Sequence, residues 1–349
     1  MKRMVVLICI LGILVCLITL FPTEFVSAVN ESDSEKNNVL LDQELNAKLS
    51  IIKKEEIVRA KETLREFGLS ENIVNDLPEH ELAHYAGAEL IHSSVAYVKS
   101  DYILKYDPVS GEETIFQTGK EEITENEAFK LVQIENRRVK QLQIERIMRS
   151  SASKLAIIPS ATGSAQTTVG NTILRVSIFV SKQGSVCNFQ TTTEILSSPV
   201  AYITDIIATG HNYNMTKVGG SGYSRAAYDK IKIDYKPTGG ETYIGQETIA
   251  TSMVSDCNYG YIYKYNIPTD YPCGPMEFYV ARNIRGYLSF RATSLGSGPW
   301  GVRALFGHQY RTFNIGVSAN IDASGFSLGV SINPESRYHI AQKYISFSG

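Results

Sequence analysis

The chain has 349 residues, of which 34 are Lys or Arg and 36 are Asp or Glu, so its net charge at pH 7 is -2. This balance excludes the dense basic surface of a nucleic-acid-binding protein, and we expect no nucleic acid partner. Hydrophobic residues make up 43% of the chain and charged residues 20%, which excludes a disordered protein, and the length is sufficient for two domains with hydrophobic cores.

Residues 1–28 have the pattern of a secretory signal peptide. Two basic residues precede an uncharged run over residues 4–21, Pro22 ends this run, and Val26-Ser27-Ala28 supplies the small residues that signal peptidase recognises. We therefore expect cleavage before Val29 and a secreted, extracellular protein. Because eighteen uncharged residues can also span a bilayer, an uncleaved N-terminal anchor is the alternative.

Three of the five cysteines, Cys187, Cys257 and Cys273, remain after the signal peptide is removed. In an oxidising extracellular compartment two of them could form a disulfide and leave one thiol. The strand expected between Cys257 and Cys273 would hold them about 25 Å apart, which disfavours that pair. The sequence assigns no disulfide, and three free thiols are an equally good interpretation.

The distribution of charge divides the mature chain into two parts. Residues 29–166 hold 24 acidic and 17 basic side chains, whereas residues 167–349 hold 11 and 15. The second part also contains 16 of the 20 tyrosines and 20 of the 26 glycines, a composition typical of short strands joined by tight turns. We predict an α+β protein with a helical acidic module and one hairpin over 29–149, a linker over 150–168, and a Tyr/Gly-rich antiparallel β-sandwich over 169–349.

In the first part the sequence predicts several helices and one hairpin, each from a local signal. A glycine is common just after the end of a helix, and Ser or Pro is common at its beginning. Alternation of apolar and polar residues indicates a strand. A Thr followed three residues later by a Glu forms a capping box, which marks the beginning of a helix. The expected elements are, in chain order, a helix over 38–67 that ends at Gly68, a short helix from Ser70 to Asp76, a helix from Pro78 to about Leu90, a strand from Ser94 to Tyr106, a turn over 107–111, a return strand over 114–117, and a helix over 128–149 that the capping box of Thr124 and Glu127 begins.

The second part alternates almost throughout between apolar and polar residues, which predicts strands. About ten such segments at short spacing are typical of an antiparallel sandwich. One segment carries a ladder of alternate tyrosines, which we interpret as sheet packing, with a surface for sugar or peptide ligands as the alternative. The expected strands include 174–180, 230–236, the tyrosine ladder at Tyr259, Tyr261, Tyr263 and Tyr265, the segments 277–282 and 287–293, and a closing hairpin over 311–331.

His80-Glu81-Leu82-Ala83-His84 has the HExxH pattern. On a helix this spacing places two imidazoles one turn apart with a carboxylate beside them, which is the arrangement of a zinc site. The segment resembles zinc aminopeptidases, whose motif often reads HELAH and whose third ligand is the glutamate of a later Asn-Glu pair, to which Asn126-Glu127 is similar. The resemblance implies a zinc-dependent peptidase in which His80, His84 and Glu127 bind zinc and Glu81 is the catalytic general base.

The surrounding sequence differs from that family. Pro78 places His80 in the first turn of its helix, Glu127 follows His84 by 43 residues, and the mature residues before the motif read as helix rather than sheet. No GxSxG, P-loop or GxGxxG pattern occurs elsewhere in the sequence. We therefore expect a non-catalytic protein without a cofactor, and we keep a zinc peptidase as an alternative.

The segment from Phe313 to Asn333 alternates apolar residues with small, uncharged ones on both sides of a turn at 322–325. A transmembrane β-hairpin needs about 9 to 11 residues in each strand, an apolar face toward lipid and a polar face toward the lumen, and this segment supplies them. A membrane-inserting, pore-forming protein is therefore a second alternative. We predict the commoner arrangement, a hairpin of the sandwich whose apolar residues lie in the core.

The chain as a whole resembles uncharacterised secreted proteins of Gram-positive bacteria. The resemblance rests on the long apolar signal, on the helical junction from Gly68-Leu69-Ser70 to Leu77-Pro78, and on the Tyr/Gly-rich second part. It implies secretion and no specific activity. We expect an extracellular binding or interaction protein whose partner is an unknown extracellular ligand or surface.

Overall fold

A computed structural model provides the structure of the chain. The described residues are 53–108, 110, 112–154, 166–199, 204–212, 214–236, 239–274, 276–294, 299–309, 318–321, 328–331 and 338–348. The predicted signal peptide, its cleavage site before Val29 and the first part of the helix expected over 38–67 lie outside these residues.

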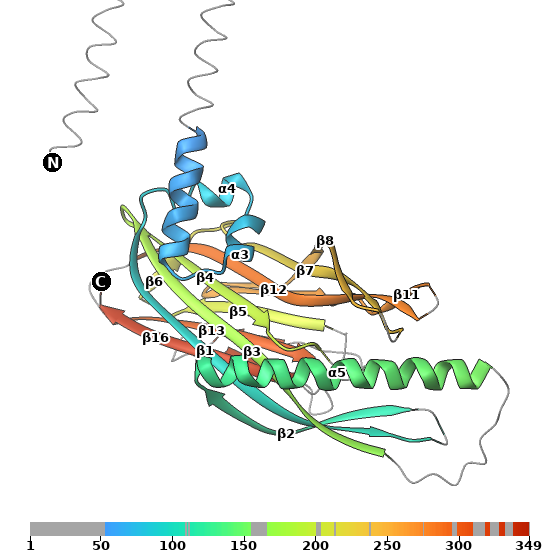
Figure 1. Ribbon diagram of the computed structural model, residues 1–349. Helices are drawn as coiled ribbons and strands as arrows, with labels where there is room; N and C mark the ends of the chain where they lie inside the picture. Colours follow the sequence, from blue (N-terminus) through green and yellow to red (C-terminus); the bar gives the residue numbers. More distant parts are fainter. Residues whose placement is uncertain are drawn as a thin grey trace, which may run out of the picture. The chain divides into compact units, whose positions relative to one another are not determined.

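The alternating segments form antiparallel strands, as predicted, and the described strands gather into two main sheets (Figure 1). The larger sheet has nine described strands in the order β2-β1-β3-β4-β12-β7-β8, and β6 and β11 also pair with β12. Its strands are β1 (Glu89–Tyr106), β2 (Glu113–Ile123), β3 (Gln166–Gln183), β4 (Val186–Ile195), β6 (Met215–Lys217), β7 (Tyr223–Asp234), β8 (Glu241–Ile249), β11 (Tyr271–Gly274) and β12 (Glu277–Ser294).

The smaller sheet has five described strands in the order β16-β13-β5-β10-β9. They are β5 (Thr204–His211), β9 (Thr251–Cys257), β10 (Gly260–Asn266), β13 (Pro299–Gln309) and β16 (Tyr338–Ser348). The two sheets enclose one hydrophobic core, because each contributes the apolar residues of one face, such as Leu174, Phe189 and Phe290 from the larger sheet and Ile207 and Phe306 from the smaller. This arrangement confirms the predicted antiparallel sandwich.

The helices cover the other face of the larger sheet. Residues 53–66 are helical, and α3 (Glu71–Asp76) and α4 (Glu79–Leu82) follow. Apolar side chains of these three helices, among them Leu64 and Ile73, pack with Phe179 of β3 and Tyr287 of β12. The long helix α5 (Glu125–Lys154) also lies on this sheet, where Gln143 Oε1 accepts a hydrogen bond of 2.7 Å from Tyr235.

Two of the expected elements differ in the structure. The helix predicted from Pro78 to about Leu90 ends at Leu82. Residues 83–87 form turns, Gly87 adopts a φ of +73° that is outside the helical range, and Leu90 pairs with Ser181 as part of β1. The segments expected over 277–282 and 287–293 form one strand, β12, with an irregularity between Arg282 and Arg285.

The hairpin expected in the N-terminal module belongs to the larger sheet. The strands β1 and β2 pair with each other, and β1 also pairs with β3 along its length, from Glu89 opposite Lys182 to Tyr106 opposite Gln166. This pairing crosses the linker expected over 150–168, and α5 extends into the linker as far as Lys154. The described residues from 56 onward form one compact unit, so the change in composition does not separate the hairpin from the sandwich.

Only short parts of the uncharged hairpin fall among the described residues. The strands β14 (Ser318–Ile321) and β15 (Leu328–Ser331) pair antiparallel, with Ser318 opposite Ser331, as a two-stranded sheet of their own. The turn at 322–325 and the outer parts of the segment from Phe313 to Asn333 lie outside the described residues. The pairing agrees with a hairpin, and the burial of its apolar residues stays a prediction.

The described residues also bear on the disulfide pairing of the cysteines and on membrane-spanning helices. Cys187, Cys257 and Cys273 are free thiols, and Cys187 is buried. No helix in the described part of the chain is both long and apolar enough to cross a membrane.

Candidate functional site

The structure places the HELAH segment at the short helix α4, against the larger sheet. Glu81 is only 5% exposed and accepts hydrogen bonds from Ser289 Oγ at 2.7 Å and from the Tyr287 hydroxyl at 3.5 Å. Burial therefore raises the pKa of Glu81 above its usual value, although Ser289 acts in the opposite direction. The carboxylate is oriented toward the sheet that α4 covers.

The two histidines of the segment have different surroundings. The ring of His80 is exposed and lies edge-on to Tyr223, with ring centroids 5.4 Å apart. His84 is half-buried, and its burial, together with the positive charge of Arg291, lowers the pKa of its imidazole. The neutral form that binds a metal is thereby favoured, but the neighbouring Arg291 opposes a cation at the same place.

Glu127, the third expected zinc ligand, has another partner. The backbone N–H of Thr124 donates to Glu127 Oε2 at 3.4 Å, and the Glu127 N–H donates to Thr124 Oγ1 at 3.3 Å. This reciprocal pair is the predicted capping box at the beginning of α5. His80, Glu81 and His84 thus have different surroundings, and Glu127 pairs with Thr124 at the beginning of α5. Among the described residues no group of three His, Cys, Asp or Glu side chains could hold a metal ion.

A buried ionic network lies next to α4. Arg285 of β12 donates from Nε to Asp76 of α3 at 2.8 Å and from Nη1 to Asp229 of β7 at 3.0 Å. Asp229 also accepts a hydrogen bond of 2.6 Å from Asn283. Because Arg285 is only 3% exposed, its guanidinium is shielded from water and bridges a helix and two strands. The network attaches α3 to the sheet.

A very small cavity accompanies this network. It has a volume of about 10 Å³ and is lined by Asp76, Arg225 and Arg285, whose Oδ1, Nε and Nη2 atoms respectively lack hydrogen-bond partners. This is about the space that one water molecule needs, and a water has both the donor and the acceptor that such a set requires. The cavity is too small for a larger ligand.

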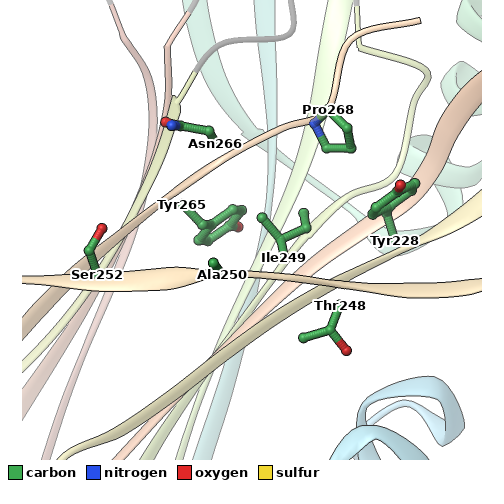
Figure 2. A pocket seen from close by; sticks show the side chains of 8 residues that line it. All are labelled: Tyr228, Thr248, Ile249, Ala250, Ser252, Tyr265, Asn266 and Pro268. Atoms are coloured by element: carbon green, nitrogen blue, oxygen red, sulfur yellow. The ribbon is translucent and has the colours of Figure 1, made fainter. Parts of the chain in front are cut away.

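An open cavity of about 340 Å³ lies where the two sheets part (Figure 2). Ala250 alone separates β8, an edge strand of the larger sheet, from β9, an edge strand of the smaller one. The chain therefore changes sheets here and leaves a gap between the two edges. Each edge strand and its neighbour contribute to the lining, which consists of Tyr228, Thr248, Ile249, Ala250, Ser252, Tyr265, Asn266 and Pro268.

The cavity has a buried inner wall and an exposed rim. Tyr228, Ile249 and Tyr265 are at most 9% exposed, and in Figure 2 the two tyrosine rings stand on either side of Ile249. Ser252 and Asn266 belong to the exposed rim. Asn266 Oδ1 accepts a hydrogen bond of 2.8 Å from Thr204, so its amide N–H groups are available to a ligand. Hydroxyl, amide, aromatic and aliphatic groups line the cavity, and none of the eight residues carries a charge.

Packing behind the cavity holds Tyr265 in place. Its hydroxyl lies 3.5 Å from Thr193 Oγ1, and a Cβ atom at Gly286 would come within 2.9 Å of the same hydroxyl, so glycine leaves the space for the ring. Asp205 and His308 are both almost fully buried, and a hydrogen bond of 2.7 Å joins His308 Nδ1 to Asp205 Oδ1. Burial raises the pKa of Tyr265 far above its usual range, and the neighbouring Asp205 acts in the same direction. Tyr265 is therefore a neutral phenol at physiological pH.

Sequence reasoning missed this cavity. Its residues come from four strands in two sheets, and no motif connects them. The one signal was Tyr265, the last member of the expected tyrosine ladder. Tyr261 and Tyr265 are almost fully buried in the core, which agrees with our interpretation of the ladder as sheet packing, and only the last ring also reaches the cavity.

Comparison with known proteins gives no family for the chain. No protein-family model matches it, and no curated protein matches it. Among solved structures it is similar to Clostridium perfringens delta-toxin, with 10% identity, 51% of this chain and 84% of that chain covered, and a TM-score of 0.22. A structure described as a pore forming protein gives 8% identity, 50% and 86% coverage and a TM-score of 0.24. The KRT10-binding region domain of the pneumococcal serine rich repeat protein PsrP gives 11% identity, 39% and 77% coverage and a TM-score of 0.17. These similarities assign no function.

Proposed function

We propose that the protein is a secreted, extracellular binding protein and that the cavity between β8 and β9 holds its ligand. The observation that carries the proposal is the cavity itself, because its volume of about 340 Å³ falls at the lower end of the range of about 300 to 1,000 Å³ that is common for small-molecule sites. The signal peptide pattern of residues 1–28 supports secretion.

The chemistry of the lining favours binding over catalysis. The aliphatic hydroxyls of the lining belong to Thr248 and Ser252, and no carboxylate or imidazole is among the eight lining residues to activate them. A hydroxyl without an adjacent base is a weak nucleophile. An aromatic and aliphatic wall with a few neutral hydrogen-bonding groups instead suits the recognition of an uncharged ligand.

A substitution at the rim tests the proposal. Ser252→Arg places a long, charged side chain at the entrance, and we expect it to reduce binding at least tenfold when the purified mature protein is screened against arrays of neutral saccharides and unmodified peptides. Asn258→Arg is the matched control, because Asn258 is exposed in the turn between β9 and β10 and does not line the cavity. If both variants bind every captured probe as the parent does, the cavity is not the binding site.

A further inference from the structure

An aromatic surface continues from the cavity along one face of the larger sheet. Tyr228 lines the cavity, and its hydroxyl donates a hydrogen bond to Glu247 of β8. Lys230, two residues further along β7, donates to the same carboxylate, with Nζ 2.8 Å from Oε1. Because alternate residues of a strand share a face, Lys230 lies on the same side of the sheet as Tyr228.

Two further tyrosines lie beside Lys230. Its Nζ atom is 4.8 Å from the ring centroid of Tyr279 on β12 and 5.4 Å from that of Tyr271 on β11, and the two centroids are 5.2 Å apart. Both distances from the ammonium group are within the range of cation–π contacts. Tyr271 is 43% exposed, so its ring is open to a ligand. We name Tyr228, Tyr271 and Tyr279, with Lys230 and Glu247 between them, the tyrosine strip.

The charges of the tyrosine strip compensate each other. Hydrogen bonds from Lys230 and Tyr228 lower the pKa of Glu247, so the carboxylate remains ionised beside the ammonium group of Lys230. A charged ligand therefore finds no single uncompensated charge on the strip. What the strip offers instead is aromatic surface next to hydrogen-bonding groups, and the adjoining cavity offers the same combination.

This combination matches the chemistry of a sugar. A pyranose ring has apolar C–H faces that pack on aromatic rings and hydroxyls that pair with amide, hydroxyl and carboxylate groups. The edge strands β8 and β9 could pair with an extended peptide through main-chain hydrogen bonds, but such pairing would not use the exposed ring of Tyr271, which lies on β11. We infer that the ligand is an uncharged carbohydrate chain whose end enters the cavity and whose following unit stacks on Tyr271. This inference rests on the proposed function.

The inference is tested with neutral oligosaccharides of one to six units, built from glucose, galactose, mannose or N-acetylglucosamine and immobilised as an array. We expect the parent to bind chains of two or more units more tightly than single units. Tyr271→Ala should weaken the binding of chains by about five- to tenfold and leave the binding of single units unchanged, because stacking of one exposed ring is lost. Ser252→Arg should weaken the binding of both.

The control is Tyr243→Ala. Tyr243 is 60% exposed on β8 and lies opposite Ile231, so it is on the other face of the sheet from Lys230, and its loss should leave binding unchanged. Equal losses for Tyr243→Ala and Tyr271→Ala would overturn the role of the strip. Folding of each variant is checked by its thermal unfolding midpoint.

The outcomes separate this inference from the proposed function. If only peptides bind, and Ser252→Arg abolishes that binding, the cavity is the binding site but the carbohydrate inference is wrong. If only anionic saccharides bind, and the binding weakens with salt, the inference of an uncharged ligand is wrong. If carbohydrate binds but neither Ser252→Arg nor Tyr271→Ala changes that binding, both the proposed function of the cavity and the inference are wrong. If no saccharide binds, the carbohydrate inference is wrong.

Discussion

Arg285 illustrates how a single residue connects the N-terminal helices to the sandwich. Its guanidinium holds Asp76 of α3 and Asp229 of β7, and all three side chains are almost fully shielded from water. A buried charge is costly unless it is paired, so the two carboxylates depend on the one cation between them. Burial nevertheless raises the pKa of Asp76, which shows that pairing with Arg285 does not fully compensate for the lost solvent.

Glu81 tests how far hydrogen bonds compensate a buried carboxylate for the loss of solvent. Its pKa is raised by burial, so as pH falls the folded protein takes up a proton at Glu81 before the unfolded chain does. Folding is thereby favoured increasingly as the pH falls through the raised pKa. We predict that Glu81→Gln, which cannot titrate, is more stable relative to the parent at pH 7.5 than at pH 5.

Thermal unfolding of both proteins at the two pH values checks this prediction. Parent and variant differ only at residue 81, so the difference between their two midpoints reports on Glu81. A difference that stays constant or grows as the pH falls would show that Glu81 is not held in a desolvated site. The same preparations can be analysed for zinc, and stoichiometric zinc lost in His80→Ala would support the alternative of a zinc peptidase.

At the level of elements, the pairing of β1 with β3 depends on a glycine under a tyrosine. Tyr102 lies directly opposite Gly170 and is fully buried, packed with Val139 and Leu142 of α5. A Cβ atom at Gly170 would be 2.3 Å from the Tyr102 hydroxyl. The absence of a side chain on one strand therefore makes room for the ring that joins the hairpin to the helix.

We predict that Gly170→Ala destabilises the protein by about 1 to 3 kcal/mol, because the buried ring of Tyr102 must move to admit a methyl group. Gly240→Ala is the matched control, since no atom lies within 4 Å of its added Cβ and its effect should be within about 0.5 kcal/mol. Urea unfolding measures both. Equal effects of the two substitutions would mean that Tyr102 is not packed on Gly170.

For the whole molecule, the question is whether the uncharged hairpin packs in the protein core or inserts into a lipid membrane. The described strands β14 and β15 pair only with each other, whereas the other described strands belong to the two main sheets. We predict that the apolar residues of the segment from Phe313 to Asn333 are buried in the protein. The alternative, insertion into a membrane, requires those same residues to meet lipid.

The substitution Val317→Lys distinguishes burial in the protein from insertion into a membrane. Burial of a valine contributes about 1.5 to 3 kcal/mol, and a buried charge adds a further penalty, so we expect the unfolding midpoint of the variant to fall clearly. Ser318→Lys is the control, since the alternation of the sequence assigns Ser318 to the polar residues of the segment and Val317 to the apolar ones. An unchanged midpoint for Val317→Lys, together with dye release from liposomes by the parent alone, would show that the hairpin is a membrane element.

The sequence by itself determined much of the local structure, although the helix predicted from Pro78 to about Leu90 ends at Leu82. The period of two predicted the antiparallel strands, Thr124 and Glu127 predicted the beginning of α5, and Ser70 and Asp76 bracketed α3. Each of these depends on residues within a few positions of one another, because capping bonds and strand alternation are local.

Only the tertiary structure decided the burial of Glu81, the membership of the hairpin in the larger sheet, and the cavity. Glu81 faces Ser289, more than two hundred positions away, and the cavity joins Tyr228 to Tyr265 across two sheets. Such convergence depends on which strands pair and where the chain changes sheets. Alternation specifies that a strand forms and which of its faces is apolar, but it does not specify which strand lies next to it. The candidate site is formed by residues of neighbouring strands, so the sequence pattern alone does not reveal it.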